Sequence, residues 1–175
     1  MHPLFDQIEL VLAQALSGLD SRQAQLRSSD HPDQWTIQQV VEHLNLTYKS
    51  TQDIMQARLA RGRPTLSCPS FSQHMMRIAV THVGFFPKGR RAPAIVTPAE
   101  SDVLLNGDQL VASVHQNLVC ADPVFEQVES AFGDRPAVTH HVMGPLSVPQ
   151  WRRFHLVHGR HHAKQILAIR GVHGI

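Results

Sequence analysis

The sequence predicts an all-α fold, a four-helix bundle in which a long crossover joins the second and third helices. Four segments carry apolar residues at intervals of three and four, the spacing of helices that bury one face. Capping-box patterns precede two of these segments. No clear run of alternating strand-like residues appears. A chain of 175 residues with 42% hydrophobic residues suits a single domain spanning residues 1–175.

The first two helices are expected on either side of a polar break. Apolar residues at helical spacing predict the first over Leu4–Leu26, and the polar stretch at 28–34 follows it. The second is expected over Ile37–Ala60, because Thr36 can cap its start and Gln39 can complete the capping box. An Arg-Gly-Arg-Pro run then ends the helix.

The crossover is expected over Pro64–Pro98, a segment too long for a tight turn. Within it, Phe71–Val83 has the pattern of a short helix. The stretch Gly84–Pro98 holds two glycines and three prolines and is expected to be loop. Its short basic run at 88–91 is typical of a solvated loop rather than of a nucleic-acid contact.

The third helix is expected over Asp108–Phe132, with a break or kink at Asp122–Pro123. The last is expected over Val148–Arg170, with Ser147 as its cap and Gly171 as its stop.

Charge and cysteine content exclude several classes of partner. The formal net charge of +2 implies no strong attraction to nucleic acid or to a membrane surface. No stretch approaches the roughly 18 apolar residues of a membrane span. Two cysteines, Cys68 and Cys120, make no disulfide framework, and the N-terminal residues do not form a signal peptide. We therefore expect a cytoplasmic protein.

The last helix concentrates histidine where leucine would be expected. The stretch FHLVHGRHHAKQI places His158 and His162 about 40° apart in the middle of the core-facing stripe. His155 shares this stripe and His161 lies at its edge. Buried imidazoles need hydrogen-bond partners or a metal ion, and two histidines four residues apart can bind one ion together. The alternative is that these histidines only pack in the core.

A metal site of this kind needs a third ligand from another helix. The second helix offers His43 in the tetrapeptide EHLN. Its position lies about one residue from the apolar centre of that helix. This placement suits a flank that faces a neighbouring helix, but it also suits a half-exposed histidine.

The stretches WTIQQVVEHL and MGPLSVPQWRRFHLVHGRHHAKQI together resemble the DinB-like (YfiT/DinB) superfamily of bacterial metal-binding proteins. The resemblance implies a four-helix bundle with a metal ion bound by His43, His158 and His162. His155 or His161 could replace one of these ligands or add a fourth. Many relatives carry His-Pro before the Gly-Pro-Leu-Ser turn where this chain has His141–Met143, so no role is assigned to that loop.

The resemblance also implies a divalent metal ion, zinc or nickel, and a function. Relatives include thiol transferases and thiol-dependent isomerases, so we expect a metal-dependent enzyme that transfers a low-molecular-weight thiol to a small electrophile. A metal-dependent hydrolase and a non-catalytic metal- or ligand-binding stress protein are the alternatives. No general base is assigned, while Tyr48 and Gln165 are candidates to orient ligands or substrate. A homodimer is compatible with such a bundle.

Overall fold

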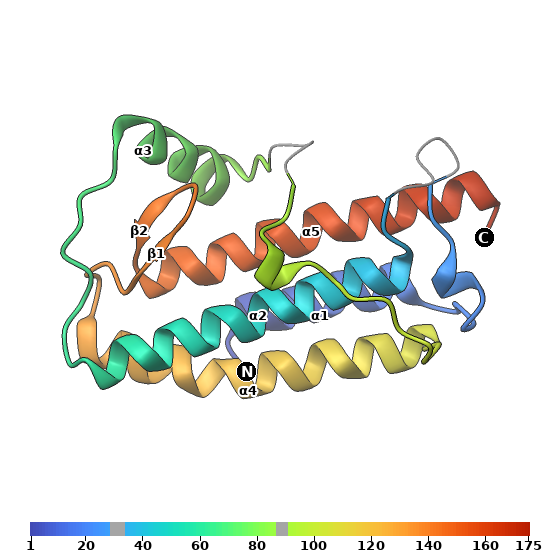
Figure 1. The fold of residues 1–175 in the computed structure, drawn as a ribbon, viewed down its shortest axis with the longest axis horizontal. Coiled ribbons are helices and arrows are strands. Elements are labelled where there is room, and N and C mark those ends of the chain that lie inside the picture. Colours follow the sequence, from blue (N-terminus) through green and yellow to red (C-terminus); the bar gives the residue numbers. More distant parts are fainter. Residues whose placement is uncertain (29–33, 87–90) are drawn as a thin grey trace.

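The computed structural model describes residues 1–28, 34–86 and 91–175, and it is mostly helical. Within these ranges four long helices lie side by side along the longest axis, with a short helix and a two-stranded sheet at one end (Figure 1). The mainly α class predicted from the sequence is confirmed. The long helices are α1 (Pro3–Leu16), α2 (Ile37–Ala60), α4 (Gly107–Phe132) and α5 (Val148–His173).

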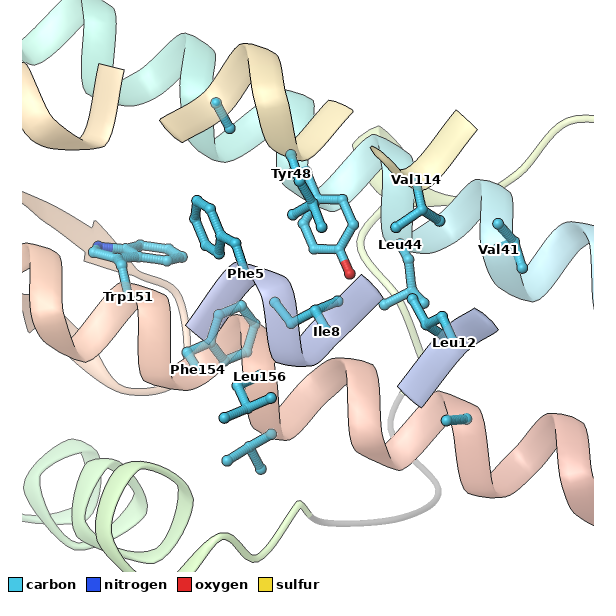
Figure 2. Packing of buried hydrophobic residues seen from close by; sticks show 14 of the residues in the cluster. Phe5, Ile8, Leu12, Val41, Leu44, Tyr48, Val114, Trp151, Phe154 and Leu156 are labelled. Carbon is cyan, nitrogen blue, oxygen red and sulfur yellow. The ribbon is translucent and has the colours of Figure 1, made fainter. Parts of the chain in front are cut away.

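The long helices contact one another in a closed order. Helix α1 packs against α4 and α5, and α2 also packs against α4 and α5. Their apolar faces meet in one core, in which Ile8 and Leu12 of α1 lie close to Leu44 and Tyr48 of α2 (Figure 2). In the part of the chain that is described, no helix is long and apolar enough to cross a membrane.

Helix α1 is shorter than predicted, because it ends at Leu16 rather than at Leu26. Gly18 adopts a left-handed conformation with φ of 73°, which ends the helix. The carboxylate of Asp20 then accepts hydrogen bonds from the backbone of the next residues and starts a separate 3₁₀ turn, η1 (Gln23–Gln25). Apolar residues continue at helical spacing beyond Leu16, but the turn at Gly18 and the side-chain bonds of Asp20 end the helix there.

Helix α2 has the predicted bounds, and its capping box is present. The Thr36 side chain accepts from the backbone N–H of Gln39 at 3.1 Å, and the Gln39 side chain accepts from that of Thr36 at 3.0 Å. These bonds satisfy two N–H groups that have no partner within the helix. The capping box therefore fixes where α2 begins.

The crossover contains the predicted short helix. Helix α3 (Phe71–Ile78) continues directly as a π-helical turn, η2 (Ala79–Val83), and Gly84 ends it at φ of 77°. The loop that follows includes a 3₁₀ turn, η3 (Ala94–Val96), which packs on α2 (Figure 1). Most of the basic run at 88–91 and most of the polar break at 28–34 lie outside the described residues.

Helix α4 runs through Pro123 without interruption, so of the predicted break or kink the break is wrong. Proline removes one hydrogen bond and costs roughly 3 kcal/mol in a helix interior. Val124 and Phe125, which follow it, are buried in the core, and this burial on the scale of about 2 kcal/mol per side chain offsets the loss. Tertiary packing therefore overrides the local signal.

A hairpin between α4 and α5 was not expected from the sequence. Strand β1 (Val138–His140) pairs antiparallel with β2 (Gly144–Leu146). Three-residue strands are too short to show an alternating pattern. The hairpin contacts α2 through β1 and α3 through β2, so it closes one end of the space between α2 and α5.

Helix α5 continues beyond the predicted stop at Gly171. It ends at His173, and Gly174 has the left-handed conformation with φ of 69°. Both glycines could serve as the C-terminal cap, and the chain uses the second. The predicted start is confirmed, with the Gln150 side chain accepting from the backbone N–H of Ser147 at 3.0 Å.

Candidate metal centre

The structure brings together the three histidines that the sequence singled out. His43 projects from α2, and His158 and His162 project from adjacent turns of α5. The Nε2 atom of His158 lies 3.2 Å from that of His43 and 2.9 Å from that of His162. The candidate ligand atoms of all three residues lie within 4.8 Å of one another. This spacing is compatible with three imidazoles around one metal ion.

All three imidazoles are buried, with between 4% and 7% of each residue exposed. Burial lowers the pKa of His43 and of His158, and it lowers the pKa of His162 to about 3. The other imidazoles lower the pKa of His158 further, because two positive charges so close would repel. The side chains are therefore neutral near pH 7, the form in which imidazole binds a metal ion.

The orientation of two rings is fixed by hydrogen bonds at their far nitrogens. The Nδ1 of His43 lies 2.7 Å from the carbonyl oxygen of Val96, and the Nδ1 of His162 lies 2.8 Å from the Oε1 of Gln165. Both partners are oxygens that accept, so each Nδ1 carries the proton. Each neutral ring then presents a lone pair at Nε2. Metal-bound histidines commonly donate their second N–H in this way.

The third ring leaves the protein's own hydrogen bonding incomplete. His158 Nε2 faces two lone pairs, and a single N–H there satisfies at most one of them well. Its Nδ1 is buried and has no hydrogen-bond partner among the described residues. Buried nitrogens without partners cost free energy. A cation between the three Nε2 atoms would use the lone pairs that face one another there, with the proton of His158 on Nδ1, so the residues present fit a divalent metal ion.

Aromatic side chains hold the imidazoles in place. Trp35 lies against His43, with ring centroids 4.8 Å apart. Phe86 and Phe154 stack on His158 at 4.9 Å and 5.3 Å. These contacts limit ring rotation, and all three aromatic side chains also line the neighbouring pocket.

The cluster opens onto a pocket of about 400 Å³. The pocket has a size suited to a small molecule. Its walls come from α2, α5, the α3–η2 segment, the loop around η3, and the turn of the hairpin. Most of the lining is apolar, and no carboxylate appears among the described lining residues. The sequence likewise offered no general base.

The two substitute histidines are not part of the cluster. His155 is 1% exposed, and its ring lies against Phe5 of α1 and Phe125 of α4. Its ring also lies 5.3 Å from that of Tyr48 of α2, so it points into the helical core rather than toward the cluster. His161 lines the pocket and lies beside Phe86, with centroids 4.9 Å apart.

The two candidates for orienting groups have different surroundings. Gln165 contacts His162, as a residue that orients a ligand would. Tyr48 lies in the core with 1% exposed, and its hydroxyl has no partner among the described residues (Figure 2). Tyr48 is thus a packing residue in this structure and does not line the pocket.

Sequence reasoning missed several residues of the site. The carbonyl of Val96 is one, and a backbone group leaves no signal in the residue type. Phe86 and His140 also line the pocket, although they come from segments that looked irregular. Only folding of the crossover and the hairpin over α2 and α5 brings these segments to the histidines.

Comparison of the chain with models of known protein families, with curated proteins and with solved structures finds no match. The similarity to the DinB-like superfamily accordingly stays a resemblance of motifs, and the function must be argued from the site.

Proposed function

We propose that this protein is a divalent-metal-dependent enzyme that acts on a small molecule. The observation that carries the proposal is the convergence of three neutral imidazoles, each with Nε2 inward, at the wall of a pocket. His43, His158 and His162 would hold the ion. The carbonyl of Val96 and the side chain of Gln165 would keep two of these ligands in the binding tautomer.

Imidazole ligands suit zinc and nickel, and the resemblance favours these two ions. A bound divalent cation would act as a Lewis acid that lowers the pKa of a coordinated thiol or water. The chain's own contribution is a largely apolar pocket beside the ligands. Such walls accept a compact, largely apolar molecule, and the side chain of Arg91 also lines the pocket.

The pocket favours an enzyme over a structural metal site. A structural site is usually closed by four protein ligands, whereas a catalytic site has three and leaves a position open. Among the described residues the cluster contains three histidines, and it lies at a pocket wall. A non-catalytic metal-binding protein is the second candidate function. It requires the three histidine ligands but no pocket for a substrate.

The resemblance to the DinB-like superfamily extends the proposal to a fold and a reaction class. The closed order of helix contacts supports a four-helix bundle with a long crossover between α2 and α4. By the same resemblance the reaction is transfer of a low-molecular-weight thiol to a small electrophile. A sulfur–carbon bond forms as the leaving group departs with its electron pair, and the thiol proton passes to solvent. Hydrolysis of a small substrate is the alternative reaction.

Metal analysis of protein purified without an affinity tag tests the binding step. We expect about one zinc or nickel ion per chain, and we expect its loss in the H43A, H158A and H162A variants. The matched control is H161A, because His161 lines the same pocket but lies outside the cluster. Binding that survives in all three cluster variants would refute the site.

Turnover is tested with the metal-loaded protein. Consumption of a thiol such as cysteine or glutathione is followed with electrophiles that include 1-chloro-2,4-dinitrobenzene, and ester hydrolysis is followed in parallel. Metal-dependent consumption that H162A abolishes supports thiol transfer, while ester cleavage alone supports the hydrolase. Stoichiometric metal without turnover of any substrate would leave the non-catalytic binding protein.

A further inference from the structure

His140, at the end of β1, has the surroundings of a substrate-binding residue. It lines the same pocket as the histidine cluster but does not belong to that cluster. Its ring lies 4.7 Å from the ring of Phe154, which in turn stacks on His158. One aromatic side chain therefore separates His140 from the proposed metal ligand.

The turn of the hairpin fixes the tautomer of His140. The backbone N–H groups of Val142 and Met143 donate to its Nδ1, at 3.1 Å and 3.3 Å. An Nδ1 that accepts two hydrogen bonds carries no proton, so the proton of the neutral ring lies on Nε2. The chain thus uses one nitrogen to close the turn and leaves the other as a donor.

The Nε2 atom has no hydrogen bond to another described residue. Both nitrogens of His155 are buried without partners. The Nε2 atom of His140 differs from them, because it is not buried from solvent. Burial and the neighbouring His141 lower the pKa of His140 to about 3, so the ring stays neutral across the physiological range.

We propose that His140 presents its Nε2–H to the pocket as a neutral donor that binds an oxygen acceptor of the substrate. The surrounding walls of Trp151, Phe154 and Met143 are apolar. The matching substrate is a small, largely apolar or aromatic molecule with a carbonyl oxygen. A neutral donor suits a carbonyl, since it supplies a hydrogen bond without adding charge beside the cluster. The bound molecule is a substrate only if the proposed function holds, so the inference rests on that function. Binding to the His140 donor itself requires no metal ion.

The test uses two probes of similar shape and the metal-free protein. Acetophenone carries a ring and a carbonyl, and ethylbenzene lacks the acceptor. Dissociation constants are measured by tryptophan fluorescence, because Trp35 and Trp151 line the pocket. The quantity compared is the ratio of the ethylbenzene to the acetophenone dissociation constant, to which a hydrogen bond of ordinary strength contributes a factor of about three to ten.

The variant His140→Asn separates the two roles of the ring. Its Oδ1 can still accept from the N–H groups of Val142 and Met143, but it has no group at the position of Nε2. We expect this ratio to fall about threefold to tenfold in the variant, while ethylbenzene binding is unchanged. His115→Asn, at an exposed position on α4, is the control and should keep the wild-type preference.

A measurement on the wild-type protein makes the test independent of folding of the variant. Nitrogen NMR of histidine-labelled protein should show His140 protonated at Nε2, with a shift on addition of acetophenone but not of ethylbenzene. Protonation at Nδ1, or equal preference for the probes in wild-type and His140→Asn proteins, overturns the inference. Because no metal is present, the result stands apart from success or failure of the metal analysis.

Discussion

At the scale of single residues, the site depends on which nitrogen of each imidazole carries the proton. Hydrogen bonds at Nδ1 fix the tautomer in two opposite ways. His43 and His162 bond through Nδ1–H and present a lone pair at Nε2, whereas His140 accepts at Nδ1 and presents an N–H. Neutral histidine thus supplies both the candidate metal ligands and the proposed donor within one pocket, with no charged side chain in the cluster.

Gln165 should control how tightly the metal binds. Its Oε1 accepts from His162, and removal of such a partner lets the ring turn and lowers its basicity. We expect Gln165→Ala to weaken zinc binding by about 10-fold to 100-fold. Competition titration against a chelator measures the change. Gln116→Ala, at an exposed position on α4, should bind zinc like the wild-type protein, and equal affinity in both variants would exclude this role for Gln165.

His155 should make the metal-free protein sensitive to acid. Burial lowers its pKa from 6.5 to about 3, so the unfolded chain binds a proton at higher pH than the folded chain. Its contribution to stability is complete above pH 6.5 and is lost as the pH falls toward 3. His155→Phe should therefore reduce the slope of unfolding free energy against pH by up to about 1.4 kcal/mol per pH unit below 6.5. Urea unfolding at several pH values measures this slope, and an unchanged slope would contradict the assignment.

At the scale of elements, close approach of backbones decides how the helices are joined. The start of α4 lies against the chain just after α1, where the N–H of Gly107 donates to the carbonyl of Leu19 at 2.9 Å. A Cβ at Gly107 would lie 2.1 Å from the carbonyl oxygen of Leu16. Glycine is required here by packing rather than by φ. The requirement is invisible in the sequence, from which the helix is expected to begin one residue later, at Asp108.

Gly107→Ala should destabilise the fold, because backbone atoms at the α1–α4 junction must move to admit the methyl group. We expect a loss of about 1–3 kcal/mol in the free energy of unfolding. Gly171→Ala in α5 is the matched control, since a Cβ there meets nothing within 4 Å. It should be neutral or stabilise by up to about 1 kcal/mol through helix propensity. Equal effects in chemical denaturation would refute the packing argument.

At the scale of the whole molecule, the site joins parts of the chain that lie far apart in sequence. His43 and His158 are separated by 115 positions, and the ring of His43 is fixed by the carbonyl of Val96 in the crossover. A metal ion bound there would link α2 to α5 and favour the loop around η3 in its folded place. Binding to the folded state alone stabilises that state by mass action.

Zinc should therefore raise the thermal stability of the metal-free protein. At a free zinc concentration 100 times the dissociation constant, we expect a gain of about 2.7 kcal/mol in the free energy of unfolding. The H158A variant should show little gain, while H161A should match the wild-type protein. Calorimetry with buffered zinc provides the measurement, and an equal gain in H158A would show that zinc binds elsewhere.

Much of the helical framework could be read from local patterns. The capping box at Thr36 and Gln39 gave the start of α2, and apolar spacing gave the long helices. The errors share a cause. Gly18 and Gly171 both offer helix ends, but only the first terminates a helix, and Pro123 is carried through because its neighbours are buried. Residue types near a helix end limit which backbone conformations are possible, and tertiary packing selects one of them.

Residue spacing along the chain was enough to predict the mainly helical class and the inward face of the last helix, because spacing fixes which side chains share a face. It therefore singled out His158 and His162, and it offered His43 as a partner. The folded chain alone shows that His43 lies beside them, that His155 lies outside the cluster, and that Val96 and the hairpin border the pocket. These outcomes depend on contacts between segments far apart in the chain, and no local periodicity encodes such contacts.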